Sequence, residues 1–369
     1  MHQKHSNISR AKFGTFARNE MAVLGTPCDQ IKILFDKIIA RFPQKNIAVV
    51  EADHQAEGNI LAFSKWTDKI NFQRFETKNN FNDFEKRMFF ENTDLTLING
   101  NHFVGKCQII VIDDKKPLEK KLSKLTDVAL VIQKSDQIPG YILDHLGDNH
   151  PPIVGWEDDE AIFNFISDYF MNRIPPLFGL VLSGGKSSRM GMDKGTLRYH
   201  NQLPQIQHCF NLLQKYCGEN VYLSVSNEQY QDLNLPIIKD SFLEIGPTGG
   251  ILSALKQHPN AAWLVVACDM PFINENTLKK LVANRNSSKI ATAFQSPNEE
   301  FPEPLITIWE PRAYPKLLTM LAYGYDCPRK TLINSDIELI KVDDPAELQN
   351  INTKEEYERA IIDLSPKIV

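Results

Sequence analysis

The segment from Leu182 to Lys194 carries the residues best suited to bind a phosphate chain. It reads Leu-Ser-Gly-Gly-Lys-Ser-Ser-Arg-Met-Gly-Met-Asp-Lys and directly follows an apolar run typical of a strand. Gly184 and Gly185 allow backbone N–H groups to approach an anion closely, and Arg189 and Lys194 add cationic donors. The spacing differs from that of a Walker loop and of a dinucleotide-binding loop. We therefore expect a triphosphate cradle of another type, with an ordinary glycine turn as the alternative.

Asp269 is the residue that we expect to bind a metal ion. It follows the apolar run 263–267 and would leave the carboxyl end of a strand, where open α/β sheets bind their ligands. A hard Mg2+ ion suits such a carboxylate, because phosphate oxygens and water can complete its coordination. The alternative is an ordinary helix N-cap. The neighbouring glycine-rich loop favours the metal.

These residues need sheets to position them, and apolar runs alternate with helix-period segments from about Met21 onward. This pattern is typical of α/β domains with mostly parallel sheets. We predict strands at 21–25, 46–51, 69–75, 94–99, 107–113, 127–132, 177–182, 220–226, 235–240, 263–269, 289–294, 304–309 and 337–342. We predict helices at 29–42, 82–92, 118–125, 157–173, 205–217, 248–257 and 276–285, and another that begins near Thr353.

The length of 369 residues favours about two domains. The pair Pro175-Pro176 cannot continue the helix predicted before it, so the break falls there. We predict an N-terminal arm at 1–20, an α/β domain at 21–173, a linker at 174–176 and a second α/β domain at 177–369.

The composition limits the classes of partner that we expect this protein to bind. A net charge of -5 provides no global field to hold nucleic acid or an anionic membrane. Apolar runs stay below the roughly 18 residues that span a bilayer, and the first residues lack the apolar core of a signal peptide. The six cysteines form no CxxC pair, so neither a zinc cage nor a disulfide framework is indicated. We expect a cytoplasmic protein with small-molecule partners, without nucleic acid or membrane.

Four motifs in order resemble the MobA family, the molybdenum cofactor guanylyltransferases. They are the glycine-rich loop, GPTGG at 246–250, the segment Ala-Cys-Asp-Met-Pro at 267–271 and Asn-Ile-Asn-Thr at 350–353. The resemblance covers about residues 177–364. It implies a Rossmann-like, GT-A-like nucleotidyltransferase domain that uses Mg2+. Such a domain joins GMP from GTP to molybdopterin, which gives the guanine dinucleotide cofactor and pyrophosphate.

The resemblance also implies roles for single residues. Catalytic charge stabilisation would come from Arg189, Lys194 and Asp269, with Asp269 as the metal ligand. Nucleotide or acceptor contacts would come from Leu182, Ser183, Gly184, Gly185, Lys194, Asn227, Asp240, Gly249, Asn350 and Asn352. Alternatives stay open for some of these. Asn227 and Asp240 could be turn formers, and 350–352 could be the lead-in to a helix capped by Thr353 and Glu356.

At two positions the sequence departs from the pattern of the family, and these positions affect the expected substrates. Ser183 stands where the family usually has alanine, and its small side chain keeps the backbone approach close. The Gly-Gly pair resembles guanylyl rather than cytidylyl relatives, so GTP is favoured over CTP. Glu303-Pro304 stands where many relatives have His-Pro, which leaves the acceptor open.

The first domain faintly resembles the MobB family of P-loop GTP-binding partners, in a degenerate form. A Walker loop needs Gly, Lys and Ser or Thr where this chain has Gln30, Ile31 and Lys32, so we expect no nucleotide hydrolysis there. A plain strand and turn is the alternative. Residues 51–54 and 99–102 fall at strand ends on one sheet edge, as turns or as a ligand or partner surface.

Three functions therefore remain: a guanylyltransferase, a relative that uses CTP or another phosphorylated acceptor, and a cofactor-assembly adaptor without catalysis. The joint presence of Arg189, Lys194 and Asp269 favours an enzyme, since a passive binder would not need them. The first domain would then dock the acceptor or a recipient molybdoenzyme.

Overall fold

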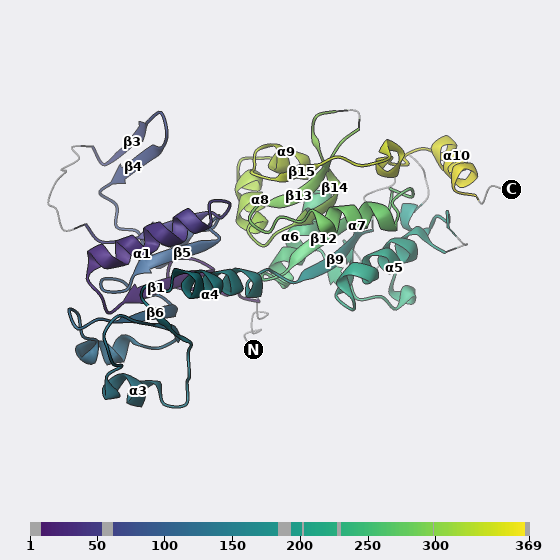
Figure 1. The fold of residues 1–369 in the computed structure, drawn as a ribbon. Helices are drawn as coiled ribbons and strands as arrows, with labels where there is room; N and C mark the ends of the chain where they lie inside the picture. The colour runs from purple at the N-terminus through teal and green to yellow at the C-terminus, as the bar shows by residue number, and fades with distance from the viewer. Residues whose placement is uncertain are drawn as a thin grey trace, which may run out of the picture. The chain divides into compact units, whose positions relative to one another are not determined.

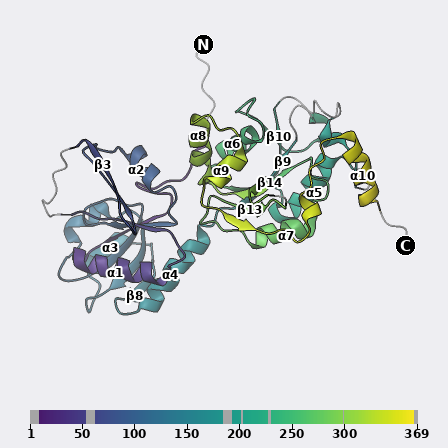
Figure 2. The same ribbon diagram turned by 90° about the horizontal axis from the view of Figure 1, so that it is seen from above.

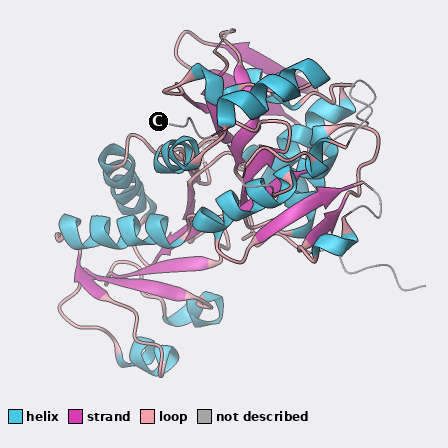
Figure 3. Ribbon diagram, turned by 90° about the vertical axis from the view of Figure 1, so that its right-hand side faces the viewer, coloured by secondary structure: helices cyan, strands magenta, loops and turns pink. Residues whose placement is uncertain are grey.

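The computed structural model describes residues 9–53, 62–183, 193–200, 203–226, 230–297 and 299–365. The chain forms two compact units, one spanning Lys12–Arg173 and the other running from Ile174 onward. Each unit contains a mostly parallel sheet with helices against it, as Figures 1 and 3 show, so the predicted α/β class is confirmed. No helix within the described ranges is long and apolar enough to cross a membrane.

The sheet of the first unit has six strands in the order β2-β5-β1-β6-β7-β8, and all its pairs are parallel. Strands β1, β5 and β6 are buried along their whole length, as expected for parallel strands covered on both faces. The strands are β1 (Glu20–Leu24), β2 (Ile47–Val50), β5 (Leu95–Asn99), β6 (Cys107–Ile112), β7 (Val128–Gln133) and β8 (Ile153–Gly155).

Helices cover both faces of this sheet. The apolar sides of α1 (Cys28–Arg41) and α4 (Asp159–Asn172) pack on one face. The 3-10 helix η1 (Glu119–Lys124) and α3 (Gly140–Leu146) pack on the other. The hairpin of β3 (Ser64–Asp68) and β4 (Gln73–Thr77) forms its own two-stranded sheet and is followed by α2 (Asp83–Phe89).

The residues just before β1, which belong to the predicted N-terminal arm at 1–20, are attached to the start of the sheet. Glu20 is 2% exposed, and its carboxylate accepts hydrogen bonds from the backbone N–H groups of Thr15, Phe16 and Ala17. The N–H of Lys106 donates to the same carboxylate at 2.8 Å. Glu20 therefore ties the segment before the central strand to the loop before β6.

We expect Glu20→Ala to destabilise the first unit by about 3 kcal/mol or more, because four backbone donors lose their shared acceptor. Urea unfolding followed by circular dichroism measures the loss. The exposed Glu119 supplies the control, since Glu119→Ala should change the free energy of unfolding by less than about 0.5 kcal/mol. Equal effects of the two variants would contradict this role of Glu20.

The second sheet has seven strands in the order β11-β10-β9-β12-β14-β13-β15. Only β14 runs antiparallel to its neighbours among the described strands. Along the chain the order moves outward from β9 and then returns to β12, and ligands bind at such a reversal in open α/β sheets. The strands are β9 (Leu177–Leu182), β10 (Val221–Val225), β11 (Ile237–Lys239), β12 (Ala262–Ala267), β13 (Ala291–Gln295), β14 (Pro302–Trp309) and β15 (Glu338–Ile340).

Two groups of helices cover the second sheet, as Figure 2 shows. Helices α5 (Gln205–Cys217) and α7 (Glu275–Ala283) pack on one face. Helices α6 (Pro247–Gln257), α8 (Ala313–Ala322) and α9 (Pro328–Ile333) pack on the other. Short 3-10 helices η2 (Lys194–Thr196), η3 (Gln231–Leu233) and η4 (Pro345–Leu348), together with α10 (Lys354–Leu364), complete the unit.

Most predicted elements are present, with instructive exceptions. The strand predicted at 69–75 is wrong, because this segment contains the turn between β3 and β4. The helix predicted at 118–125 is the 3-10 helix η1. Strand β8 and helices α3, α8 and α9 were not predicted. The capping box of Thr353 and Glu356 at the start of α10 is confirmed.

Candidate active site

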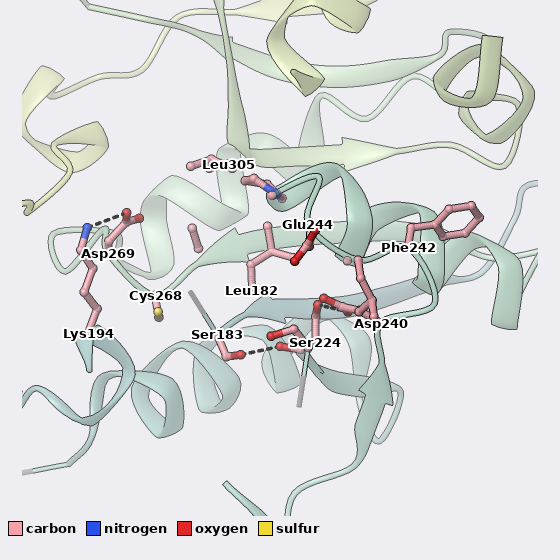
Figure 4. A pocket seen from close by; sticks show the side chains of 16 residues that line it. Leu182, Ser183, Lys194, Ser224, Asp240, Phe242, Glu244, Cys268, Asp269 and Leu305 are labelled. Carbon is pink, nitrogen blue, oxygen red and sulfur yellow. Dashed lines mark hydrogen bonds and ion pairs between the residues drawn. The ribbon is translucent and has the colours of Figure 1, made fainter. Parts of the chain in front are cut away.

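A cavity of about 660 Å³ lies at the carboxyl edge of the second sheet (Figure 4). Leu182 and Ser183 reach it from the end of β9, and Ser224 reaches it from β10. The segment 267–269 at the end of β12, and the loop before α6 with the first turn of that helix, form further walls. The sheet thus brings loops distant in sequence to one cavity, as the reversal of strand order requires.

Lys194 joins two of the predicted segments across this cavity. Its Nζ donates to Oδ2 of Asp269 at 3.2 Å and to Oδ1 of Asn352 at 2.7 Å. The backbone N–H of Ile351 donates to the carbonyl oxygen of Asp269 at 2.8 Å. Three predicted segments therefore meet at one ammonium group: the glycine-rich loop, the strand-end aspartate and the Asn-Ile-Asn segment. Figure 4 shows the contact between Lys194 and Asp269.

Asp269 has one carboxylate oxygen that no described residue uses. Its Oδ1 is buried without a hydrogen-bond partner among the described residues, whereas Oδ2 pairs with Lys194. Helix α7, the next helix, is capped by Asn274, so Asp269 is not its N-cap. A buried, unpaired carboxylate oxygen beside a cavity is a suitable ligand for a hard divalent cation. The described residues contain no cluster of three or more His, Cys, Asp or Glu, so other ligands would have to complete the shell.

A second polar group lies across the cavity from this pair, around Asp240 (Figure 4). The hydroxyl of Ser224 donates to Oδ1 of Asp240 at 2.7 Å, and that of Ser183 donates to the carbonyl oxygen of Ser224 at 2.5 Å. Burial raises the pKa of Asp240, and the hydrogen bond from Ser224 opposes that rise. The cavity thus has a cationic end at Lys194 and a hydrogen-bonding end at Asp240.

The two glycines near the start of α6, Gly249 and Gly250, differ in role. A Cβ on Gly250 would lie 2.3 Å from the Ser224 hydroxyl, so the missing side chain leaves room for the cavity wall. A Cβ on Gly249 would lie 2.2 Å from the backbone oxygen of Phe242, and Gly249 does not line the cavity. Gly249 therefore permits close packing, and Gly250 is the one beside the polar group.

Lys194 is also held from the side of its own loop. The hydroxyl of Tyr230 donates to the carboxylate of Asp193 at 2.5 Å, and the same carboxylate accepts from the Gly195 N–H at 3.0 Å. Burial raises the pKa of Tyr230, so the phenol keeps its proton and remains a donor. The sequence offered no signal for Tyr230, because its partner lies in a different loop.

The remaining predicted residues have less defined positions. Gly184, Gly185, Arg189 and Asn227 lie outside the described residues. Asn350 has a buried side-chain oxygen with no hydrogen-bond partner among the described residues, and it does not line the cavity. The prediction missed several cavity-lining residues, namely Ser224, Phe242, Glu244 and Leu305. Of these, Ser224 had a detectable signal, as a polar residue inside an apolar strand.

Two stacked histidines support the loop that carries Asp269. The rings of His200 and His208 stack with centroids 3.9 Å apart. Nε2 of His200 lies 2.7 Å from the carbonyl oxygen of Pro271, two residues beyond Asp269. Burial is the main cause that lowers the pKa of His208 to about 4, and the neighbouring His200 lowers it further. His208 is therefore neutral in the folded protein near neutral pH.

This depressed pKa predicts a loss of stability in mild acid. The His208 pKa falls from its ordinary 6.5 to about 4 on folding, so its contribution is complete above about pH 6.5 and declines as the pH falls toward 4. After a reduction for the partial exposure of His208, we expect the free energy of unfolding to fall by about 1–2 kcal/mol over this pH range. Unfolding of the wild type and of His208→Gln at several pH values tests this. Parallel pH profiles for the two proteins would contradict the prediction.

The cavity lies at the carboxyl edge of the sheet of an α/β domain, and comparison with known proteins identifies the class of this domain. Residues 179–335 match the MobA-like NTP transferase domain, so the second unit is a nucleotidyltransferase domain. A molybdenum cofactor guanylyltransferase from Xanthomonas euvesicatoria is 30% identical over 193 residues, 50% of this chain and 95% of that protein. The chain therefore belongs to the molybdenum cofactor guanylyltransferase family.

Two further similar proteins cover about the same share of the chain. A molybdenum cofactor biosynthesis bifunctional protein from Synechocystis is 40% identical over 185 residues, which are 49% of this chain. The match covers 53% of that relative, so this chain spans about half of its length. Molybdopterin-guanine dinucleotide biosynthesis protein A from Archaeoglobus fulgidus is 24% identical with a TM-score of 0.43, covering 51% of this chain and 98% of that one.

Proposed function

We propose that this protein transfers GMP from GTP to molybdopterin, forming the guanine dinucleotide cofactor and releasing pyrophosphate. One observation carries the proposal: Lys194, Asp269 and Asn352 converge at a cavity of about 660 Å³ in a nucleotidyltransferase domain. A triphosphate at this end would meet the ammonium group, and its nucleoside would extend toward Asp240. The assignment of GTP and molybdopterin as the two substrates rests on the family to which the chain belongs.

Lys194 would act by neutralising charge. In the chain alone its ammonium pairs with Asp269, and both side chains are mostly buried. A triphosphate oxygen would compete for that ammonium, and the low local dielectric would strengthen the contact. As a phosphate oxygen of the acceptor attacks the α-phosphorus, Lys194 would stabilise the added negative charge and the departing pyrophosphate. The protein needs no covalent intermediate for this reaction.

Asp269 would hold Mg2+ through its unpaired Oδ1, with phosphate oxygens and water as further ligands. When bound, the ion supplies positive charge to the phosphate oxygens. Arg189 and the amides of Gly184 and Gly185 keep their proposed roles at the phosphates. Asn350 and Asn352 are proposed to face the acceptor side, and Asn352 already fixes the position of the Lys194 ammonium.

We propose that the acceptor side includes the position that departs from the family, where the buried Glu303 pairs with the partly exposed Arg329. Glu303 is 5% exposed, and Nη2 of Arg329 lies 3.3 Å from its carboxylate. Burial raises the pKa of Glu303, whereas Arg329 lowers it. A carboxylate in place of histidine would change how the acceptor is recognised. We therefore propose molybdopterin on the strength of the family and regard other phosphorylated acceptors as a competing outcome.

The first unit is proposed to have no nucleotide hydrolysis. The connection from β1 to α1 is only Gly25–Pro27, and a Cβ on Gly25 would lie 2.3 Å from the backbone oxygen of Val111. So short a turn leaves no loop to wrap a phosphate chain, in contrast to a Walker loop. We propose that this unit docks the acceptor or a recipient molybdoenzyme.

We expect Lys194→Met to lower kcat at least about 100-fold, because the developing phosphate charge loses its cationic partner. The melting temperature should fall only modestly, because the side chain bonds only to loop groups, although Asp269 loses its cationic partner. Pyrophosphate release with GTP, Mg2+ and molybdopterin measures turnover. Lys279→Met, which alters an exposed lysine on α7, is the matched control and should keep wild-type turnover. Full activity of Lys194→Met, or a parallel loss of activity and melting temperature, would contradict the role.

The same assay separates the competing functions. Preferential turnover of GTP over CTP supports the guanylyl specificity, and preferential turnover of CTP overturns it. Tight GTP binding without pyrophosphate release, with molybdopterin and Mg2+ present, would indicate an adaptor. Turnover with a different phosphorylated acceptor but not with molybdopterin would overturn the proposed acceptor. It would still support nucleotidyl transfer as the reaction.

A further inference from the structure

The first unit contains a thiol–imidazole pair at the carboxyl edge of its sheet. Sγ of Cys28 lies 3.3 Å from Nε2 of His102. Cys28 begins α1 just after β1, and His102 follows β5, which pairs with β1 in parallel. Adjacent parallel strands end at the same edge, so the topology brings these two side chains together. Cys28 is partly exposed, so reagents can reach the sulfur.

A second donor and a cation adjoin the same sulfur. The side-chain amide of Asn101 donates to Sγ of Cys28 at 3.8 Å and to the backbone oxygen of Thr26 at 2.9 Å. Its Oδ1 accepts from Nζ of Lys121 at 3.0 Å, so this ammonium lies one amide away from the thiol. Cys28 also occupies the first turn of a 14-residue helix, where exposed N–H groups favour negative charge. Imidazole, amide, ammonium and helix end therefore surround a single sulfur at the edge of the sheet.

The other cysteines differ from Cys28. Cys107, Cys209, Cys217 and Cys268 are buried, and burial raises the pKa of each thiol. Cys327 is exposed and stands at the N-cap of the short helix α9, and no histidine of the described part of the chain hydrogen-bonds to its sulfur. Cys327 therefore serves as an internal reference. It is more accessible than Cys28, but within the described residues its sulfur has no imidazole partner.

We propose that Cys28 is a nucleophilic thiol, activated by His102, that forms a mixed disulfide with a small anionic disulfide. Nε2 of His102 takes the thiol proton, and the sulfur attacks one sulfur atom of the incoming disulfide. The old S–S bond breaks as the new one forms, and the departing thiolate takes the proton back from the imidazolium. One disulfide is consumed and another forms, so no further oxidant is needed. Lys121 and the helix end favour an anionic partner over a neutral one.

The test uses the full chain and two disulfide probes, the dianionic dithiobisnitrobenzoate and the neutral dithiodipyridine. Peptide mass spectrometry follows modification of Cys28 and Cys327 in the same sample over time. We expect Cys28 to react about tenfold faster than Cys327 with the dianionic probe, and its preference for that probe over the neutral one to exceed that of Cys327. A Cys28 rate equal to or below that of Cys327 with both probes overturns the proposal.

Variants separate activation from mere accessibility. His102→Gln retains an amide donor but cannot take the proton, so Cys28 should slow to about the rate of Cys327. Lys121→Gln should remove the preference for the dianionic probe and leave the reaction with the neutral probe unchanged. His150→Gln changes an exposed histidine of the same unit and is the matched control, with wild-type rates expected. Circular dichroism checks the fold of each variant, and unaltered Cys28 rates in folded His102→Gln also overturn the proposal.

Discussion

The pairing of Lys194 with Asp269 depends on the reversal of strand order between β9 and β12. Both strands are parallel neighbours with central positions, so the loops that leave their carboxyl ends are forced to adjoin. The ammonium group then meets a carboxylate 75 residues away and an amide 158 residues away. Without that strand order, the three motifs would remain separate turns with no shared ligand. The nucleotidyl-transfer proposal therefore rests on sheet topology before it rests on any side chain.

Buried and partly buried polar side chains fix the loops that the sheets bring together. In the second unit, Asp193 accepts from both the Tyr230 hydroxyl and the Gly195 N–H, which holds the residues on either side of Lys194. In the first unit, Glu20 gathers four backbone N–H groups at the start of the central strand. The buried Glu20 carboxylate is stable in its place because these backbone N–H groups occupy its lone pairs. Asp269 differs, since one of its oxygens remains available for a ligand.

The two units show how similar architectures acquire different chemistry. Both sheets reverse their order beside a central strand, β1 in one and β9 in the other. In the first unit a short turn joins that strand to a helix, and a cysteine stands where a phosphate loop would end. In the second unit a long glycine-rich segment follows the strand and leads to Lys194. Function therefore follows from the loops that each sheet supports rather than from the sheet itself.

Local patterns in the chain were enough to predict the α/β class, the helix at 205–217 and the capping box of Thr353 and Glu356. Periodicity and capping involve residues within a few positions of one another, so they can be read directly. The hairpin β3–β4 was mispredicted, because its exposed strands lack a buried face, and α8 was missed because Pro315 lies in its first turn. The contacts of Lys194 with Asn352, of Tyr230 with Asp193 and of Cys28 with His102 arise only on folding. They join residues from separate loops, and no local pattern records which loops a sheet will place side by side.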